Sequence, residues 1–490
     1  MGSSGVGVRM WSLRLIRTPL HLPRNIAAHF SPSRRSLRTS CSTTTLGNDK
    51  KKKKVIVISG PTGAGKSKLA LELAKRLNGE IISADSVQVY RGLDVGSAKP
   101  LPSDRKEVPH HLIDILHPSE EYSAGQFFED ARHATKDIFD HGCVPIVTGG
   151  TGLYLRWYIY GKPEVPKVSL EIGSEVCSEL NLLQQNGDWD VAVELLEKAG
   201  DPRAKSLARN DWYRLQRSLE IIKATGSPPS AFHIPYDSFM RHLYSSASLS
   251  CPGDYTPPNH SEENLAKDRH GDYMPLNHSD ENLAKDRHGD YMPPNHSEEN
   301  LAKDLDYDFL CFFLSSQRVE LYRRIDLRCE EMLTETQGLL SEATWLLESG
   351  LLPNMNSATR AIGYRQAMEY LSFCRKNGGQ SSPRDFFRFL SDFQKASRNF
   401  AKRQMTWFRS ELIYQWLDAS QPLETVLNYI LDAYHDQTRG LVVPSVIKMD
   451  RGVSSRKEIF DLKTYRTSNR VFVQPEDCSH ILDWVRRTQR

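Results

Sequence analysis

The sequence lacks several features that mark whole classes of protein. Its eight cysteines lie singly along 490 residues, and no two of them form a C-x-x-C pair. This scatter argues against a disulfide framework and against a zinc site built from cysteine pairs, and it suits a reducing compartment. No apolar run approaches the roughly 20 residues that a membrane-spanning helix needs. We therefore expect a soluble protein with no membrane partner.

Acidic residues are missing from the first 48 positions, which hold seven Arg and eight Ser among scattered apolar side chains. This composition is typical of an organelle transit peptide. The alternative is an unstructured basic leader that carries no targeting signal. The lysine run 50–54 follows as a linker, or as a nuclear signal if no import occurs. We predict that residues 1–54 lie outside the fold and direct the protein to the plastid or mitochondrion, with the cytoplasm as the alternative.

Charge is distributed unevenly, although the formal net charge is only +3. Residues 1–54 carry a net +11, from twelve Lys and Arg against one Asp. Residues 254–308 hold fourteen Asp and Glu against five Lys and Arg, whereas residues 358–409 hold eleven Lys and Arg against three Asp and Glu. Local charge is therefore a better guide to partners than the total.

The segment Val55–Ser67 predicts a phosphate-binding loop. Val55–Ser59 is mainly apolar and predicts a buried strand, and the next eight residues, GPTGAGKS, match G-x-x-x-x-G-K-[ST]. A helical pattern follows, with leucines at 69, 73 and 77. Strand, glycine loop and helix in this order are the context of a P-loop, although a chance glycine turn is the alternative. Lys66 would then neutralise phosphate charge, and the Ser67 hydroxyl would hold Mg²⁺.

Two further strand ends bear on the chemistry. A strand over 80–84 ends at Asp85, which should face the phosphate site because ligands gather at the carboxyl ends of parallel strands. Another strand, Val144–Thr148, runs into Gly-Gly-Thr and lacks the carboxylate that ATP-hydrolysing P-loop enzymes often carry there. This absence weakens an ATPase assignment. His110 and His111 lack further metal ligands at useful spacing, so we expect a structural or loop role for them.

Helices are predicted over 170–225. Arg214 and Arg217 share one face of the last helix, which suits an anion, although a solvated, salt-bridged face is an equally ordinary interpretation. An 18-residue unit, NHSEENLAKDRHGDYMP with one further residue, then starts at 259, 277 and 295. It is too polar to bury a solenoid core, so we predict a disordered insertion over 236–305.

The globular pattern returns with a strand over 308–315 and a helix predicted over 318–347. A basic and aromatic turn follows at 360–365, and a further helix is predicted from 383 to 413. On that helix Lys395, Arg398, Lys402 and Arg409 form one stripe, and Phe393, Ala396, Phe400 and Trp407 form another on the opposite face. The basic stripe could be a solvated face, but its density favours contact with a phosphate backbone.

Several segments together resemble one family, the tRNA dimethylallyltransferases (tRNA isopentenyltransferases). They are, in order, GPTGAGKS, ADSVQVYRGLDVGSAKP, PHHLID, TGGTGLY, NDWYRLQRSLE, RAIGYRQ and KRQMTWFR. The resemblance implies an α/β fold, with a P-loop NTPase-like parallel sheet, an inserted helical domain and C-terminal helices. It also implies transfer of a dimethylallyl group from dimethylallyl diphosphate to N6 of the adenosine on the 3′ side of the anticodon in tRNA.

The resemblance carries roles to individual residues of this chain. The expected catalytic residues are Asp85 as general base, Lys66 and Thr151. The expected diphosphate ligands are Gly60, Thr62, Gly63, Gly65, Lys66, Ser67 and Arg217, with Ser67 holding Mg²⁺. The expected tRNA contacts are Ser86, Val87, Gln88, Arg214, Gly363, Tyr364, Arg365, Lys402 and Arg403. Residues 411–490 contain one cysteine, Cys478, so the C2H2 zinc finger of many eukaryotic relatives is not expected and the chain looks like the bacterial-type branch.

The expected partners are dimethylallyl diphosphate, Mg²⁺ and a tRNA anticodon stem-loop, without zinc, on a monomer. In a plant the product would be a source of cis-zeatin-type cytokinins. An adenylate isopentenyltransferase acting on free AMP, ADP or ATP, a small-molecule or nucleotide kinase and a non-catalytic RNA-binding protein are the alternatives. The predicted segments are 1–54 (leader and linker), 55–160 (P-loop core), 161–235 (helical, tRNA-binding), 236–305 (repeats), 306–415 (core completion and basic helices) and 416–490 (C-terminal extension).

Overall fold

A six-stranded parallel sheet lies at the centre of the fold. The computed structural model describes residues 52–490, apart from 208, 238, 241–304, 335–337, 439 and 453–455. The strands are hydrogen-bonded in the order β3-β2-β4-β1-β5-β6, and each neighbouring pair is parallel. Their bounds are β1 Lys54–Ser59, β2 Gly79–Ala84, β3 His110–His111, β4 Val144–Gly149, β5 Asp308–Ser315 and β6 Gln415–Asp418. The predicted α/β fold class with a parallel sheet is confirmed.

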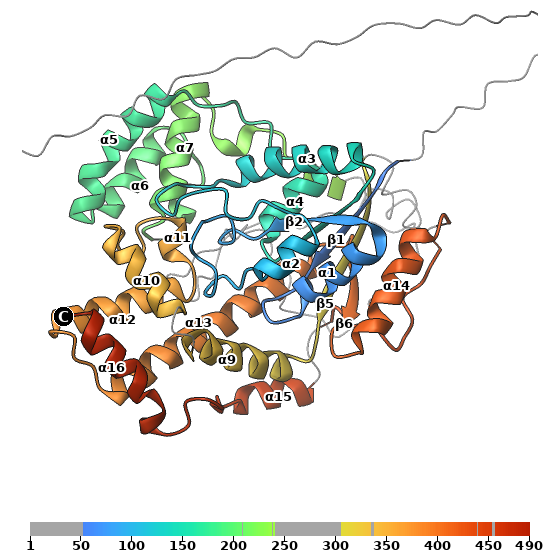
Figure 1. Cartoon of the computed structure of the whole chain (residues 1–490). Helices are drawn as coiled ribbons and strands as arrows, with labels where there is room; N and C mark the ends of the chain where they lie inside the picture. Colours follow the sequence, from blue (N-terminus) through green and yellow to red (C-terminus); the bar gives the residue numbers. More distant parts are fainter. Residues whose placement is uncertain are drawn as a thin grey trace, which may run out of the picture. The chain divides into compact units, whose positions relative to one another are not determined.

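Helices cover both faces of this sheet (Figure 1). The helices around the sheet are α1 Lys66–Leu77, α2 Pro102–Glu107, α3 Ala124–Asp140, α4 Gly152–Tyr160 and α14 Leu423–His435. Side chains of β1 alternate between the faces, so Ile56 packs with α1 and α14 while Val57 packs with α3 and α4. Burying each such side chain stabilises the fold by about 1.5–3 kcal/mol. Two apolar layers therefore fix β1 and the loop that follows it.

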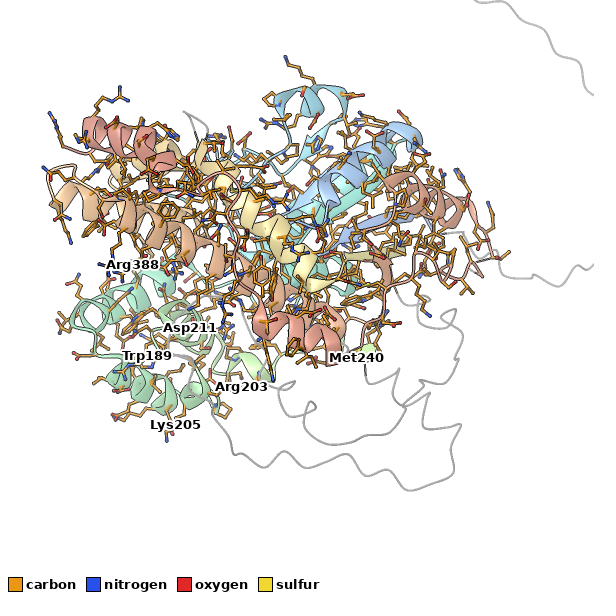
Figure 2. The ribbon with its side chains drawn as sticks, turned by 90° about the horizontal axis from the view of Figure 1, so that it is seen from below. Trp189, Arg203, Lys205, Asp211, Met240 and Arg388 are labelled. Atoms are coloured by element: carbon orange, nitrogen blue, oxygen red, sulfur yellow. The ribbon has the colours of Figure 1, made fainter. Side chains whose placement is uncertain are left out.

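A helical unit separates α4 from β5 in the sequence. It contains α5 Leu170–Asn186, α6 Trp189–Lys198 and α7 Trp212–Thr225, with short 3-10 turns η1 Ala204–Ser206 and η2 Pro229–Ala231. Val176, Trp189 and Leu215 contribute to a core of its own. In Figure 2 the labelled Trp189, Lys205 and Asp211 lie on or beside these green helices. The unit occupies the range predicted for a helical insertion.

The helices after β5 are α9 Arg318–Thr334, α10 Leu339–Glu348, α11 Ser357–Arg360, α12 Tyr364–Lys376 and α13 Pro383–Arg409. The single helix predicted over 318–347 is wrong, because α9 ends at Thr334 and Gly338 is the N-cap of α10. Glycine is a poor helix former and favours such a break. Helix α13 begins at a capping box in which Ser382 and Asp385 bond one another, and it ends four residues before the predicted end.

The C-terminal segment belongs to the core. Strand β6 pairs with β5, so the predicted boundary between 415 and 416 passes through a strand. The remaining elements are α15 Arg456–Thr464, η5 Pro475–Cys478 and α16 Ser479–Thr488. Phe472, Cys478 and Val485 are buried in the same cluster as α12 and α13. Residues 416–490 therefore complete the fold, which the sequence alone did not indicate.

The edges of the repeat segment are ordered. Tyr236 and Phe239 lie against Tyr160, with ring centroids 5.1 and 4.7 Å apart, and Leu305 is buried. The insertion predicted over 236–305 is therefore too wide at both ends, and its interior, 241–304, lies outside the described residues, as do residues 1–51. Among the described helices, none is long and apolar enough to cross a membrane. The six cysteines in the described ranges are unpaired.

Candidate active site at the glycine loop

The glycine loop, residues 60–67, connects the carboxyl end of β1 to the first turn of α1. Gly63 and Gly65 have φ values of 79° and 88°, in the left-handed region that glycine adopts without strain. A side chain at Gly63 would also meet Ile325 of α9, 3.2 Å from an added Cβ. The loop therefore places the N-terminus of a 12-residue helix, with its partial positive charge, at the carboxyl edge of the sheet.

Two side chains from the second half of the chain hold this loop. The Gln404 carboxamide oxygen accepts a hydrogen bond from the Thr62 amide at 2.9 Å, and its NH₂ group donates to the Gly150 carbonyl at 3.0 Å. The Arg328 guanidinium donates to the Thr62 hydroxyl at 3.0 Å. A Cβ at Gly150 would collide with Gln404, so glycine there permits the close approach. The loop, the end of β4 and helices α9 and α13 thus meet at one place.

Lys66 is held back against the glycine loop. Its ammonium donates to the Pro61 carbonyl at 2.9 Å. Removal from water lowers the pKa of Lys66 to about 8, the Asp85 carboxylate acts in the opposite direction, and Arg328 lowers it further. Burial also lowers the pKa of Arg328. The two cations and the carboxylate are therefore near enough to interact, and the two cations favour an anionic ligand.

Asp85 follows β2 directly and opens the loop 85–99. One carboxylate oxygen, Oδ1, accepts hydrogen bonds from the amides of Val87 at 2.9 Å and Gln88 at 3.4 Å. Among the described residues the other oxygen, Oδ2, has no hydrogen-bond donor. The half-buried carboxylate thus has a fixed orientation and one oxygen available for a ligand, as expected for a base at this strand end.

The loop 85–99 is closed by its own polar groups. The Gln88 oxygen accepts from the Ser83 hydroxyl at 2.9 Å, and its NH₂ group donates to the carbonyls of Ser97 and Ala98 at 3.3 and 3.2 Å. Gln88, predicted to contact tRNA, therefore already has partners within the protein. Ser86 and Val87 beside it are half-buried, and the Ser86 hydroxyl makes no hydrogen bond to the described residues.

A buried carboxylate ties this loop to the turn before α12. Glu342 of α10 accepts hydrogen bonds from the amides of Asp94, Val95 and Gly96 at 2.7, 2.7 and 3.0 Å. It also accepts from the Tyr364 hydroxyl at 2.7 Å. Tyr364 is fully buried, and burial raises its pKa well above the usual value. Its side chain is turned into the protein, and the assignment of this residue to tRNA contact stays a prediction. The Tyr364 hydroxyl thus stabilises the Glu342 carboxylate, which in turn holds the loop 85–99 in place.

Thr151 lies on the neighbouring strand end. It is the N-cap of α4, its amide donates to the Ala84 carbonyl at 3.4 Å, and its side chain makes no cap hydrogen bond. Since Ala84 precedes Asp85, the Thr151 hydroxyl and the Asp85 carboxylate belong to adjacent strand ends. Tyr154, in the first turn of α4, stacks on Phe127 of α3 with ring centroids 4.3 Å apart. This aromatic pair makes the start of α4, beside Thr151, apolar and rigid.

The arginines predicted on α7 are engaged locally. Arg214 pairs with Asp211 at 3.3 Å and Arg217 with Glu220 at 3.1 Å. This is the salt-bridged face that the sequence offered as the alternative to an anion site. No described contact joins Arg217 to the glycine loop, so its assignment to diphosphate stays a prediction. Sequence reasoning missed Arg328, which does contact the loop. The sequence shows that Arg328 follows Arg324 at helical spacing. No local pattern, however, links Arg328 to Thr62, which lies 266 residues away.

Comparison with known proteins agrees with this geometry. The chain is 59% identical to tRNA dimethylallyltransferase 9 of Arabidopsis thaliana over 451 residues, which cover 91% of this chain and 90% of that protein. A family model described as IPP transferase matches residues 88–247 and 286–411. The chain belongs to the tRNA dimethylallyltransferase family. A second model, described as Isopentenyl transferase, matches residues 53–114, so the glycine loop and Asp85 also lie in matched sequence.

More distant members of the tRNA dimethylallyltransferase family also align over most of the chain. The enzyme of that name from Protochlamydia amoebophila is 35% identical over 386 residues, which cover 79% of this chain and 90% of that protein. A crystal structure of a eukaryotic dimethylallyltransferase acting on tRNA aligns with a TM-score of 0.53 at 24% identity, covering 84% of each chain. This likeness supports the fold assigned above.

A tRNA dimethylallyltransferase needs exposed cations for its tRNA, and the predicted basic stripe on α13 supplies them only in part. Lys395 and Lys402 are exposed, and Arg403 is half-buried. Arg398 instead pairs with the buried Asp326. The prediction of a continuous phosphate-binding stripe is therefore wrong at Arg398, because tertiary packing uses this arginine inside the protein.

The remaining predicted residues are placed as follows. Gly363 has a φ of 94° and Phe393 lies 3.1 Å from an added Cβ, while Arg365 is half-buried. His111 contacts Glu80 at 2.6 Å, and the His110 ring contacts the Val108 carbonyl at 2.8 Å. These contacts within the protein are consistent with the structural or loop role predicted for the two histidines. Among the described residues, no group of three or more His, Cys, Asp or Glu side chains could hold a metal ion.

Proposed function

We propose that the protein transfers the dimethylallyl group of dimethylallyl diphosphate to N6 of the adenosine on the 3′ side of the anticodon in tRNA. The observation that carries this proposal is the meeting of Lys66, Arg328 and Asp85 at the glycine loop of a tRNA dimethylallyltransferase fold. Two cations suit the diphosphate leaving group, and one carboxylate suits the amine that replaces it.

The cations act on the leaving group. As the bond between carbon and diphosphate oxygen breaks, negative charge grows on the diphosphate, and preorganised donors aimed at that charge stabilise the transition state. Lys66, Arg328 and the loop amides at the start of α1 supply these donors. Lys66 would leave the Pro61 carbonyl, and Arg328 would leave the Thr62 hydroxyl or bridge it to the ligand.

Mg²⁺ fits beside these groups. Ser67 is exposed on the first turn of α1, and its hydroxyl makes no hydrogen bond to the described residues. Magnesium commonly takes only one or two protein oxygens and completes its shell with phosphate oxygens and water. Ser67 and the diphosphate would hold the ion, which neutralises further leaving-group charge when bound.

Asp85 acts on the nucleophile. The exocyclic amine of adenosine is a weak nucleophile, and it must lose a proton as its nitrogen bonds to the dimethylallyl carbon. The Asp85 oxygen Oδ2 would accept this proton, while the Thr151 hydroxyl would orient the amine. The strand β4 ends in Thr148 and Gly149 without a carboxylate, so nothing there would activate a competing water. This arrangement favours transfer to nitrogen over hydrolysis.

The tRNA would be bound by cations around the site. Lys402, Arg403, Arg365, Arg214 and Arg217 are the candidates for its phosphates. The target base must leave its stack to reach Asp85, which costs least in a single-stranded loop such as the anticodon loop. The leader 1–54 would direct the enzyme to a plastid or mitochondrion, and the modified tRNA would be a source of cis-zeatin-type cytokinins.

The acceptor separates this proposal from an adenylate isopentenyltransferase. Purified protein would be incubated with labelled dimethylallyl diphosphate, Mg²⁺ and either an unmodified anticodon stem-loop or AMP. We expect label on the stem-loop, at the adenosine 3′ to the anticodon, and none on AMP. Label on AMP alone would overturn the proposal. A stem-loop with guanosine at the target position is the matched control and should stay unlabelled.

We also predict that dimethylallyl diphosphate binding takes up protons near pH 8. Because the pKa of Lys66 is lowered to about 8 in the free protein, a large fraction of molecules lack the ammonium proton at this pH. A bound diphosphate favours the charged form and raises that pKa. Proton uptake by Lys66 should be small near pH 6 and largest around pH 8–9, and affinity should fall as the pH rises through this range.

Calorimetry without tRNA, in two buffers of different ionisation enthalpy, measures this proton uptake. The Lys66→Arg variant stays protonated throughout the range, so it reports the ligand's own protonation, and the difference between the two proteins belongs to Lys66. Equal proton uptake by both proteins at pH 8 would contradict the prediction.

A further inference from the structure

Two carboxylates of α9 are removed from solvent on the side away from the glycine loop. Asp326 and Glu330 are 1% and 0% exposed and lie one helical turn apart, on one face of the helix. Both are bonded by residues 465–472, which we call the C-terminal strap. The strap lies outside residues 88–247 and 286–411, which the IPP transferase model matches. It also follows α15, which packs along α9 (Figure 1).

Glu330 is bonded by the backbone of the strap. Its carboxylate accepts hydrogen bonds from the amides of Arg470, Val471 and Phe472 at 3.1, 2.8 and 2.9 Å. Phe472 is itself 1% exposed and packs edge-to-face on Phe386 of α13 at 5.0 Å. A buried carboxylate is costly unless donors of this kind surround it, so Glu330 and the strap depend on each other.

Asp326 bonds both the strap and α13. It accepts from the Tyr465 hydroxyl at 2.7 Å and pairs with Arg398, which also donates to the Thr467 hydroxyl at 3.0 Å. Gln394 of α13 donates to the Asn469 side chain at 3.0 Å. The strap is therefore bonded along its length to α9 and to α13.

Arg328 lies between these carboxylates in sequence but on the other side of the helix. At 100° per residue, its side chain is about 160° away from both Asp326 and Glu330. It bonds to Thr62, and Ile325 packs against Gly63. Helix α9 is thus held between the glycine loop and the strap, and a rotation of the helix would move Arg328 off the loop.

We propose that the C-terminal strap is a positioning element for the diphosphate site. By satisfying Asp326 and Glu330, it fixes the rotation of α9 and so aims Arg328 at the glycine loop. Asp326 and Glu330 act through Arg328 and are positioning residues. The inference rests on the proposed function for its substrate, dimethylallyl diphosphate. It assigns a role in the site to a segment that the IPP transferase model does not include.

The test replaces Glu330 with glutamine, which keeps the shape, removes the charge that the three strap amides solvate and sets an NH₂ group against the Arg470 amide. We expect the KM for dimethylallyl diphosphate to rise about tenfold, the scale of one charge-assisted hydrogen bond, while the KM for the stem-loop stays within about twofold. Calorimetry with dimethylallyl diphosphate alone should show the same loss of affinity. Tyr465→Phe, a milder change, should act in the same direction.

A double-mutant cycle separates positioning from general stability. In an Arg328→Ala background, Glu330→Gln should change diphosphate affinity by less than about twofold, because the residue through which it acts is gone. Asp385→Asn is the control, since it removes a capping carboxylate at the far end of α13. It should lower stability and leave diphosphate affinity unchanged.

The outcomes distinguish the inference from the proposed function. Equal effects of Glu330→Gln with and without Arg328, or an equal loss in Asp385→Asn, would overturn the positioning role. If the unmodified protein bound dimethylallyl diphosphate but labelled no tRNA, the proposed function would fail. The calorimetric cycle would still decide the role of the strap.

Discussion

Replacing Asp85 with asparagine is expected to lower kcat for transfer to the anticodon stem-loop by about 10²–10⁴-fold, the usual contribution of a positioned general base. The carboxamide oxygen of the new side chain can still accept from the Val87 amide, so the loop 85–99 keeps its shape. The carboxamide cannot take the proton that N6 must release. Single-turnover rates at saturating dimethylallyl diphosphate measure the chemical step, and direct binding of the stem-loop measures affinity, which should be unchanged.

Asp94 provides the matched control in the same loop. Its carboxylate pairs with Lys99 at 2.7 Å and is 57% exposed, so Asp94→Asn makes the same chemical change away from the cations of the site. The Lys99 ammonium is buried, but it keeps Asp114 as a second partner at 2.6 Å, so this variant should turn over within about twofold of the unmodified protein. Near-normal turnover in Asp85→Asn would refute the general-base assignment. Loss of stem-loop binding in that variant would show that Asp85 acts on affinity.

The sequence predicted well those parts of the site that local pattern determines. The strand before Gly60, the glycine loop and the helix beyond it follow one another without a break. The bounds of β1 agree with the expectation to within a residue, and α1 contains the three leucines of the predicted helical pattern. Asp85 could be placed for a similar reason, because a strand end in a parallel sheet has a known relation to the ligand site. These inferences required only neighbours in the sequence and the rules of parallel sheets.

Contacts between distant parts of the chain could not be predicted in this way. Gln404 meets Thr62 across 342 residues, and Glu342 meets the loop 94–96 across about 247. Either residue, seen in its own helix, is an ordinary polar side chain. Their roles follow only from the packing of α10 and α13, which is determined by the whole apolar core.

Burial was misjudged for the same reason. Tyr364 and Arg398 lie in basic, aromatic stretches that indicate nucleic-acid contact, but the fold turns both toward carboxylates, Glu342 and Asp326. Pattern alone does not distinguish a cation that faces a phosphate from one that faces a buried acid. The C-terminal strap, which supplies other partners of Asp326, had no recognisable motif at all.

Arg328 and Arg217 show most clearly where the sequence and the structure favour different residues. Each follows another arginine at helical spacing, and the sequence analysis chose Arg217 as the diphosphate ligand. We predict that Arg328→Ala lowers kcat/KM for dimethylallyl diphosphate by about 10²–10³-fold, as expected for loss of one preorganised donor to developing charge. Arg328 contacts Thr62 of the glycine loop, whereas Arg217 pairs with Glu220 and is 41% exposed. Arg217→Ala should therefore lower the same constant by less than about tenfold.

The two variants are best compared at saturating stem-loop, with dimethylallyl diphosphate varied, and with diphosphate binding measured separately by calorimetry. Arg323→Ala on α9 is the control, because its guanidinium is 57% exposed and pairs with Glu320 on the solvent side. It should change neither constant by more than about twofold, since such surface pairs contribute little. Arg328→Lys should recover only part of the loss, because a single ammonium cannot bond both the Thr62 hydroxyl and a phosphate oxygen with the fork of a guanidinium. A larger loss in Arg217→Ala than in Arg328→Ala would reverse the assignment and make α7, not α9, the source of the second cation at the diphosphate.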